Sequence, residues 1–140
     1  MSEMNMFPAL DIAGSGMTAE MRRLEVVAAN IANAQTIRTD EGGPYRRRDI
    51  IFRTVMDQAS GGRFVPKVQV EGVVPDQSDL KRVYEPGHPD ADKEGFVSMP
   101  NVDIVYEMVD MMSSMRAYES NLRTSRSFRS MAESALRIGR

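Results

Sequence analysis

The first part of the chain carries apolar residues at the spacing of an amphipathic helix. Leu10, Met17, Leu24 and Ile31 recur every seven residues, and alanines and a valine fill most of the intervening heptad positions. The only proline near this stretch is Pro8, and a proline in the first turn of a helix costs little because its missing N–H is not needed there. The pattern predicts a helix over about residues 6–34 with a seam for a partner helix.

The last part predicts a second, longer helix. Residues 101–138 contain no proline and no glycine, and Asn101 or Asp103 can cap the first turn. At 1.5 Å per residue this helix is about 50 Å long, which in so short a chain is typical of coiled coils and bundles. Its apolar stripe comprises Val105, Met108, Met111, Met112, Met115, Tyr118 and Leu122. We predict that the seven-residue pattern of the first helix faces Met108, Met115 and Leu122 of the same chain.

The segment between the helices has the texture of strands and turns. Residues 49–56 are rich in β-branched and apolar side chains, and residues 64–74 alternate with a period near two. Glycines and prolines punctuate the rest as turns. We therefore expect an α+β fold, mainly α. Two terminal helices (1–36 and 101–140) pair as a coiled coil, and a small antiparallel β unit of three to five strands (37–100) leans on them.

Composition narrows the class of protein further. The net charge of −2 gives no strong attraction to nucleic acid or anionic membranes, and no apolar run is long enough to span a bilayer. The N-terminus shows no pattern of a cleavable secretory signal. The chain has no cysteine, which excludes disulfides and thiolate metal sites. Its 12 methionines suit surfaces that fit more than one neighbour, although any single methionine is more often core filler.

Candidate chemistry is sparse. The single histidine, His88, has four acidic neighbours in a proline-rich turn, but no second histidine or ligand spacing supports a metal. No nucleophile–base motif or phosphate-binding loop is present. Tyr45 and the three arginines that follow it favour an exposed loop or a charged strand edge over a nucleic-acid contact. We expect no enzymatic activity, no metal and no cofactor.

Two pairs of residues in the first helix suggest close helix contacts. Gly14 and Gly16 each cost a helix about 1 kcal/mol relative to alanine, so we expect another backbone to pass close to them. Asn30 and Asn33 lie on one side of the helix, where amides can fix the register of a helix pair. Asn33 has the alternative reading of a residue that frays the helix end. We predict that Asn30 bonds to a neighbouring helix.

The stretch from Gly14 to Thr36 resembles the N-terminal signature of the bacterial flagellar rod and hook proteins, whose core Ala/Ser-x-Asn-Ile/Leu-Ala-Asn is matched by Ala28–Asn33. The final helix, with Met115–Asn121, is similar to the C-terminal segment of that family. Residues 35–40 depart from the Pro-Gly-Tyr turn common in the distal rod and hook members. This departure fits the proximal rod branch, as do three further stretches: Gly42–Arg48, Val83–Asp92 and Gly95–Asp103.

The resemblance implies a structural subunit of the proximal rod in the flagellar basal body, the periplasmic shaft that transmits torque from the motor to the hook and filament. It further implies export through the flagellar type III apparatus and an axial coiled coil of terminal helices. Implied partners are copies of the chain, other proximal and distal rod proteins, and the rod adaptor at the export gate.

We expect the assembly interface to include Leu10, Gly14, Gly16, Met17, Leu24, Asn30, Ile31, Asn33, Met108, Met115, Tyr118 and Leu122. The residues alone also allow a different class of protein, a self-contained helical adaptor that dimerises through a four-helix bundle. An enzyme is a distant third interpretation.

Overall fold

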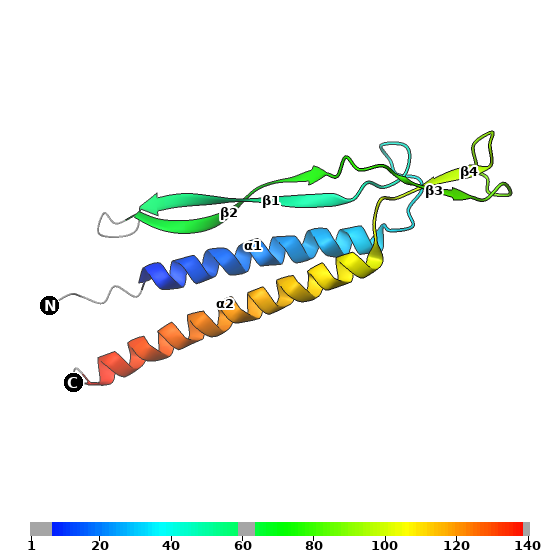
Figure 1. Ribbon diagram of the computed structural model, residues 1–140. Coiled ribbons are helices and arrows are strands. Elements are labelled where there is room, and N and C mark those ends of the chain that lie inside the picture. Colours follow the sequence, from blue (N-terminus) through cyan, green and yellow to red (C-terminus); the bar gives the residue numbers. More distant parts are fainter. Residues whose placement is uncertain (1–6, 59–63, 139–140) are drawn as a thin grey trace.

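The computed structural model, which describes residues 7–58 and 64–138, is layered around its first helix (Figure 1). The elements are α1 (Phe7–Ala32), β1 (Arg48–Gln58), β2 (Phe64–Pro75), β3 (Lys81–Tyr84), β4 (Phe96–Met99) and α2 (Ile104–Ile138). Helix α1 lies between the β1–β2 hairpin and α2, and the two helices run antiparallel. The β3–β4 hairpin lies beyond the end at which α1 stops and α2 starts. The predicted fold class, two long helices around small antiparallel sheets, is confirmed.

Local sequence signals set the ends of both helices. Pro8 occupies the first turn of α1, as predicted. The side chain of Asn33 donates to the carbonyl of Ala29 at 2.9 Å and accepts from the hydroxyl of Thr36 at 3.2 Å, so it closes the last turn of α1. In α2 the cap is Asp103, whose carboxylate accepts from the backbone N–H of Val105 at 3.0 Å.

The β segments form two separate two-stranded sheets rather than the single unit predicted. Strands β1 and β2 pair antiparallel from Arg48↔Pro75 to Gln58↔Phe64, with a bulge between Ile51 and Phe52. Strands β3 and β4 pair from Lys81↔Met99 to Tyr84↔Phe96. The longer hairpin packs along α1, where the hydroxyl of Ser15 accepts from the N–H of Val68 at 3.2 Å. The expectation that the strands lean on a helix is confirmed.

Few apolar side chains are buried in the described part of the chain. They are mostly small: Ala13, Ala19, Val27, Tyr45, Val65, Val97 and Val102. Large apolar side chains remain exposed on both faces of the layered structure, among them Met56, Phe64, Val105 and Met112. Thin layers enclose little volume, so the chain alone leaves much apolar surface in contact with water.

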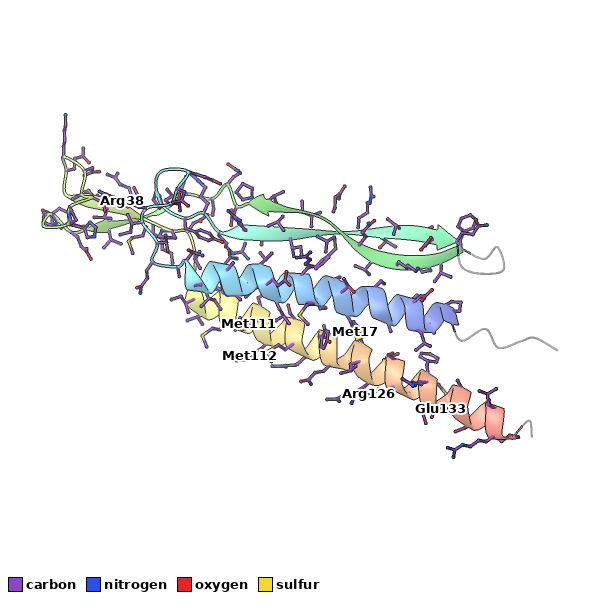
Figure 2. The ribbon with its side chains drawn as sticks, turned by 180° about the vertical axis from the view of Figure 1, so that it is seen from behind. Met17, Arg38, Met111, Met112, Arg126 and Glu133 are labelled. Atoms are coloured by element: carbon purple, nitrogen blue, oxygen red, sulfur yellow. The ribbon has the colours of Figure 1, made fainter. Side chains whose placement is uncertain are left out.

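The seam between α1 and α2 corrects the predicted heptad register. Gly16, Arg23 and Asn30 of α1 have direct neighbours on α2, and each lies one position before the predicted Met17, Leu24 and Ile31. On α2 the buried positions are Glu107 and Ser114. They precede Met108 and Met115, which are each 49% exposed. Met17 and Met111 flank the seam, whereas Met112 points away from α1 (Figure 2). The apolar stripe exists, but its centre faces outward because the contact is occupied by two polar pairs, Asn30–Glu107 and Arg23–Asp110, and by the small Ser114.

The two glycines of α1 differ in their surroundings. A Cβ atom at Gly16 would lie 2.7 Å from the side-chain nitrogen of Asn121 on α2, so the close neighbour there is a side chain and not the backbone that was predicted. A Cβ atom at Gly14 would meet nothing within 4 Å, so within the chain the prediction is wrong for Gly14. Only Gly16 is therefore needed for the helices to approach each other.

This difference predicts opposite responses to the same substitution. Gly14→Ala should raise the free energy of unfolding by about 1 kcal/mol, since alanine is the better helix former and has room. Gly16→Ala should show no such increase in the free energy of unfolding, because the new methyl group displaces the amide of Asn121. Thermal unfolding of both variants measures the difference. Asn121→Ala in the Gly16→Ala background should recover the gain, and equal melting temperatures for the two single variants would contradict the assigned contact.

Candidate functional site

The most constrained side chain in the structure is the buried amide of Asn30, which is 0% exposed. Its nitrogen donates to the carbonyl of Arg48 and to the carboxylate of Glu107, both at 2.9 Å. Its oxygen accepts from the hydroxyl of Tyr45 at 3.0 Å and from the N–H of Arg48 at 2.9 Å. An asparagine side chain has two donor hydrogens and two acceptor lone pairs. All four are used, and they join α1 to α2 and to the start of β1.

Glu107 places a carboxylate in the same interior, where it is 1% exposed. Besides the amide of Asn30, it accepts from the guanidinium Nε of Arg47 at 2.6 Å. Burial by itself lowers the pKa of Arg47, but hydrogen bonds to Glu107 and Asp49 outweigh it and hold the pKa above its ordinary value. Arg47 is thus a permanent cation that compensates the buried charge of Glu107.

Tyr45 completes the polar cluster, which we define as Asn30, Tyr45, Arg47 and Glu107. Burial raises the pKa of its phenol, the charge of nearby Arg48 opposes this rise, and Glu107 adds to it. The guanidinium of Arg48 lies 5.7 Å from the centre of the Tyr45 ring. A phenol that keeps its proton remains a donor to Asn30, so burial and the charge of Glu107 support the bond between them.

Asn101 extends the polar cluster toward the β3–β4 end. Its side-chain oxygen accepts from the backbone N–H of Arg47 at 2.8 Å, and its nitrogen donates to the hydroxyl of Ser78 at 2.8 Å. On the other side, Arg23 of α1 pairs with Asp110 of α2. A cavity of about 340 Å³ lies beside these residues. Of its charged lining residues, Arg23 pairs with Asp110 and Arg47 pairs with Asp49 and Glu107, whereas the guanidinium of Arg48 lies over the ring of Tyr45. The arrangement holds α1, α2 and the start of β1 together.

The outside of α2 is apolar and exposed, in contrast to the polar cluster. We define its outer stripe as five apolar residues, each at least 49% exposed: Val105, Met108, Val109, Met112 and Met115. Their spacing of three and four residues puts them on one face over three turns. In this part, helix α2 therefore turns Glu107 and Ser114 inward and the five residues of the outer stripe outward, the reverse of an ordinary amphipathic helix.

A groove lies beside the seam at the level of Tyr118. Its volume is about 470 Å³, and α1 contributes Gly14, Met17 and Met21 to its lining, together with Thr18, Arg22 and Glu25. Leu10, Leu24 and Ile31 of α1 and Leu122 of α2 are half-buried. Of the predicted assembly residues, Gly14, Met17 and Tyr118 line the groove, and Met108 and Met115 lie on the outer stripe.

Asn30 and Asn33 make different kinds of contact in the structure. The prediction that Asn30 bonds to a neighbouring helix is confirmed within the chain, where that helix is α2. With no exposed surface, Asn30 is not itself a contact to another subunit. Asn33 bonds to the end of α1 and to the turn that follows.

Sequence reasoning missed Tyr45, Arg47 and Glu107. The expectation of an exposed, charged segment at 45–48 is wrong for Tyr45 and Arg47, which turn inward to Asn30 and Glu107. The available signal was Glu107, a lone carboxylate within a run of apolar helix residues.

Other candidate groups are accounted for locally. The ring Nδ1 of His88 accepts from the N–H of Asp90 at 3.1 Å, which stabilises its turn. Across residues 7–58 and 64–138, no three histidine or acidic side chains gather in a way that would hold a metal ion. No helix in those ranges has both the length and the apolar character of a membrane span.

Comparisons with known proteins match both ends of the chain. The family described as "Flagella basal body rod protein" matches residues 10–38. The family described as "Flagellar basal body rod FlgEFG protein C-terminal" matches residues 93–138. The two matches cover α1 with the turn after it, and β4 with α2.

Three relatives are similar over nearly their whole length, and each is named flagellar basal-body rod protein FlgC. The relative from Borreliella burgdorferi is 44% identical, covering 96% of this chain and 98% of its own length. The relative from Salmonella typhimurium is 42% identical, with 99% of both chains covered. The relative from Bacillus subtilis is 38% identical, covering 98% of this chain and 100% of its own.

The four bonds of Asn30 predict a large effect from an isosteric change. Asn30→Asp keeps the shape but removes both donor hydrogens and sets a second carboxylate against Glu107. The free energy of unfolding in urea should fall by about 3 kcal/mol or more. Asn33→Asp, the same substitution at the end of α1, should cost about 1 kcal/mol or less. Similar losses in the two variants would contradict the central place of Asn30.

The raised pKa of Tyr45 predicts a loss of stability in alkali. Because the folded chain holds the phenolic proton more tightly than the unfolded chain, the contribution is complete below about pH 10 and is lost as pH rises through the raised pKa. Tyr45→Phe should reduce stability at neutral pH by about 1 kcal/mol and flatten the alkaline decline. Tyr106→Phe, at an exposed position, should change neither. Urea unfolding between neutral pH and pH 11 provides the test.

Proposed function

The chain belongs to the FlgC family of flagellar basal-body rod proteins, and from this premise we propose that it joins the rod through the outer stripe of α2. It is a structural subunit of the rod in the flagellar basal body, the shaft that carries torque to the hook and filament. The observation that carries the proposal is the reversed polarity of α2, with Glu107 and Ser114 inside and the outer stripe outside.

The outer stripe has the form of a helix-docking surface. Valines and methionines at three- and four-residue spacing form a ridge that packs into the groove of a second helix. Burial of such side chains is favourable by roughly 25 cal/mol per Å² of apolar surface. In the single chain this gain is unused, because α1 covers the opposite face of α2.

The same surface suits more than one partner. We propose as neighbours other copies of the chain, the other proximal and distal rod proteins, and the rod adaptor at the export gate. Three of the five residues in the outer stripe are not merely apolar but flexible: Met108, Met112 and Met115 can adapt their shape to different helices. A subunit that meets unlike neighbours along a shaft needs that adaptability.

The location follows from the same proposal. We place the chain in the proximal part of the rod, within the periplasm, after export through the flagellar type III apparatus. Gly14, Met17 and Tyr118, which line the groove beside the seam, form a second surface for a neighbouring subunit. Two different surfaces generate head-to-tail contacts, and such contacts produce a helical array when the rotation does not close.

Substitution of Met112 tests the outer stripe. Met112→Glu should leave the free energy of unfolding of the purified chain within about 0.5 kcal/mol of the original, since the side chain is exposed. In a bacterium where the variant replaces the native chain, swimming in soft agar and the number of rods in purified basal bodies should both collapse, because a charge would be buried between subunits.

Two matched variants separate charge from shape at this position. Met112→Leu keeps an apolar side chain of similar volume and should assemble normally, whereas Met112→Gln should give an intermediate yield of rods. Normal swimming by Met112→Glu cells that secrete the variant at ordinary levels would refute the docking role of the outer stripe.

A further inference from the structure

A second opening lies on the other side of the seam, between α1, the β1–β2 hairpin and α2. Its volume is about 350 Å³, and it differs from the groove at Tyr118 because the hairpin forms one wall. Ile12, Ala19, Phe52 and Val68 give it an apolar lining, and Gly16 and Asn121 lie at its α2 side. We refer to this opening as the Glu20 cavity, after its one acidic lining residue.

Glu20 is the anomaly in the Glu20 cavity. One oxygen of its carboxylate is shielded from solvent and has no hydrogen-bond partner within the described residues. A shielded carboxylate oxygen without a donor costs free energy, and natural structures seldom leave one. The cavity therefore combines an apolar wall with a single unmet requirement for a donor, preferably a positively charged one.

The neighbours of Glu20 within the described residues do not supply this donor. Arg53 lines the same cavity, but its guanidinium lies 3.9 Å from Glu71 on the exposed side of the hairpin. The amide nitrogen of Asn121 is held close to Gly16. Neither donates a hydrogen bond to Glu20 in the structure.

The chain itself carries a complementary group. The second half of α2, residues 116–138, has five arginines against two glutamates. Two of the arginines pair within the helix, Arg123 with Glu119 and Arg129 with Glu133. The remaining three are Arg116, Arg126 and Arg137, for which no ion pair forms within the described residues. Figure 2 shows Arg126 on the side of α2 away from α1.

We propose that the Glu20 cavity receives an arginine from the second half of α2 of another copy of the chain. The aliphatic stem of the arginine packs against Ile12, Phe52 and Val68, and its guanidinium donates to the carboxylate of Glu20, whose shielded oxygen turns toward the cavity as the arginine enters. This inference rests on the proposed function, because it adds a second, charge-selective contact to the same rod. It also assigns the contact between like copies, whereas the outer stripe accepts several partners.

Neutralisation of Glu20 is the first test. Glu20→Gln should leave the melting temperature of the purified chain unchanged or raised, since a poorly solvated charge disappears. The yield of intact rods in cells that carry the variant should fall by about tenfold, because one charge-assisted bond is lost at every contact. Glu71→Gln, which removes an exposed carboxylate from the hairpin, should change neither measurement.

Cysteine cross-linking identifies the donor. The chain contains no cysteine, so introduced pairs give an unambiguous signal. Thr54→Cys at the Glu20 cavity is combined in turn with Ser113→Cys, Ser127→Cys or Leu136→Cys, which flank the three arginines without replacing them. Mild oxidation of basal bodies should produce a ladder of covalent multimers for one of the pairs and none for any single-cysteine variant.

The outcomes distinguish this contact from the outer stripe. A lower melting temperature for Glu20→Gln would show that the carboxylate serves the chain internally and would overturn the proposal. Normal rods in Glu20→Gln cells, while Met112→Glu cells lack them, would overturn it and leave the proposed function intact. Absence of a ladder for all three cysteine pairs would exclude the second half of α2 as the donor.

Discussion

The amide of Asn30 is the point on which the three layers depend. It bonds to α2 through Glu107 and to the start of β1 through both backbone groups of Arg48. Helix α1 contacts the hairpin on one side and α2 on the other. The polar cluster is therefore where all three meet, and it sets the register of the hairpin and of α2 against α1. A buried amide accepts few alternative arrangements, because each one leaves a donor or acceptor unpaired.

The polar seam between α1 and α2 also determines which residues α2 exposes to solvent. When Glu107 and Ser114 face α1, the periodicity of α2 necessarily turns Met108, Met112 and Met115 toward solvent. Apolar burial between the helices would stabilise a single chain more simply. The polar arrangement instead fixes one geometry and leaves the apolar surface exposed, where the proposed contacts between subunits would bury it.

The sequence predicted the helices and strands well, but it predicted poorly which face of each helix packs against the other. One physical reason explains both results. Helix ends, the Asp103 cap and the strand periods are local properties, readable from neighbouring residues. The facing of a helix depends on what covers it, and in a rod protein part of the cover belongs to other subunits. The apolar stripe of α2 was real, but the assumption that apolar residues face the intramolecular partner shifted the register by one residue, from Glu107 and Ser114 to Met108 and Met115. The inward turn of Tyr45 and Arg47 could not be predicted either, because no local pattern marks these residues as partners of Asn30 and Glu107.

The proposed contacts lie on different sides of the α1–α2 seam, and they differ in chemistry. The Glu20 cavity is bounded by the hairpin, whereas the groove at Tyr118 has no hairpin residue in its lining. A two-fold dimer needs only one self-complementary patch, but an open helical array needs two unlike patches on each subunit. An apolar, adaptable outer stripe together with a cavity that selects a single cation supplies two such patches. Because the cation site requires a particular side chain, it fixes the axial register between like copies, which a stripe of flexible methionines leaves free to slide.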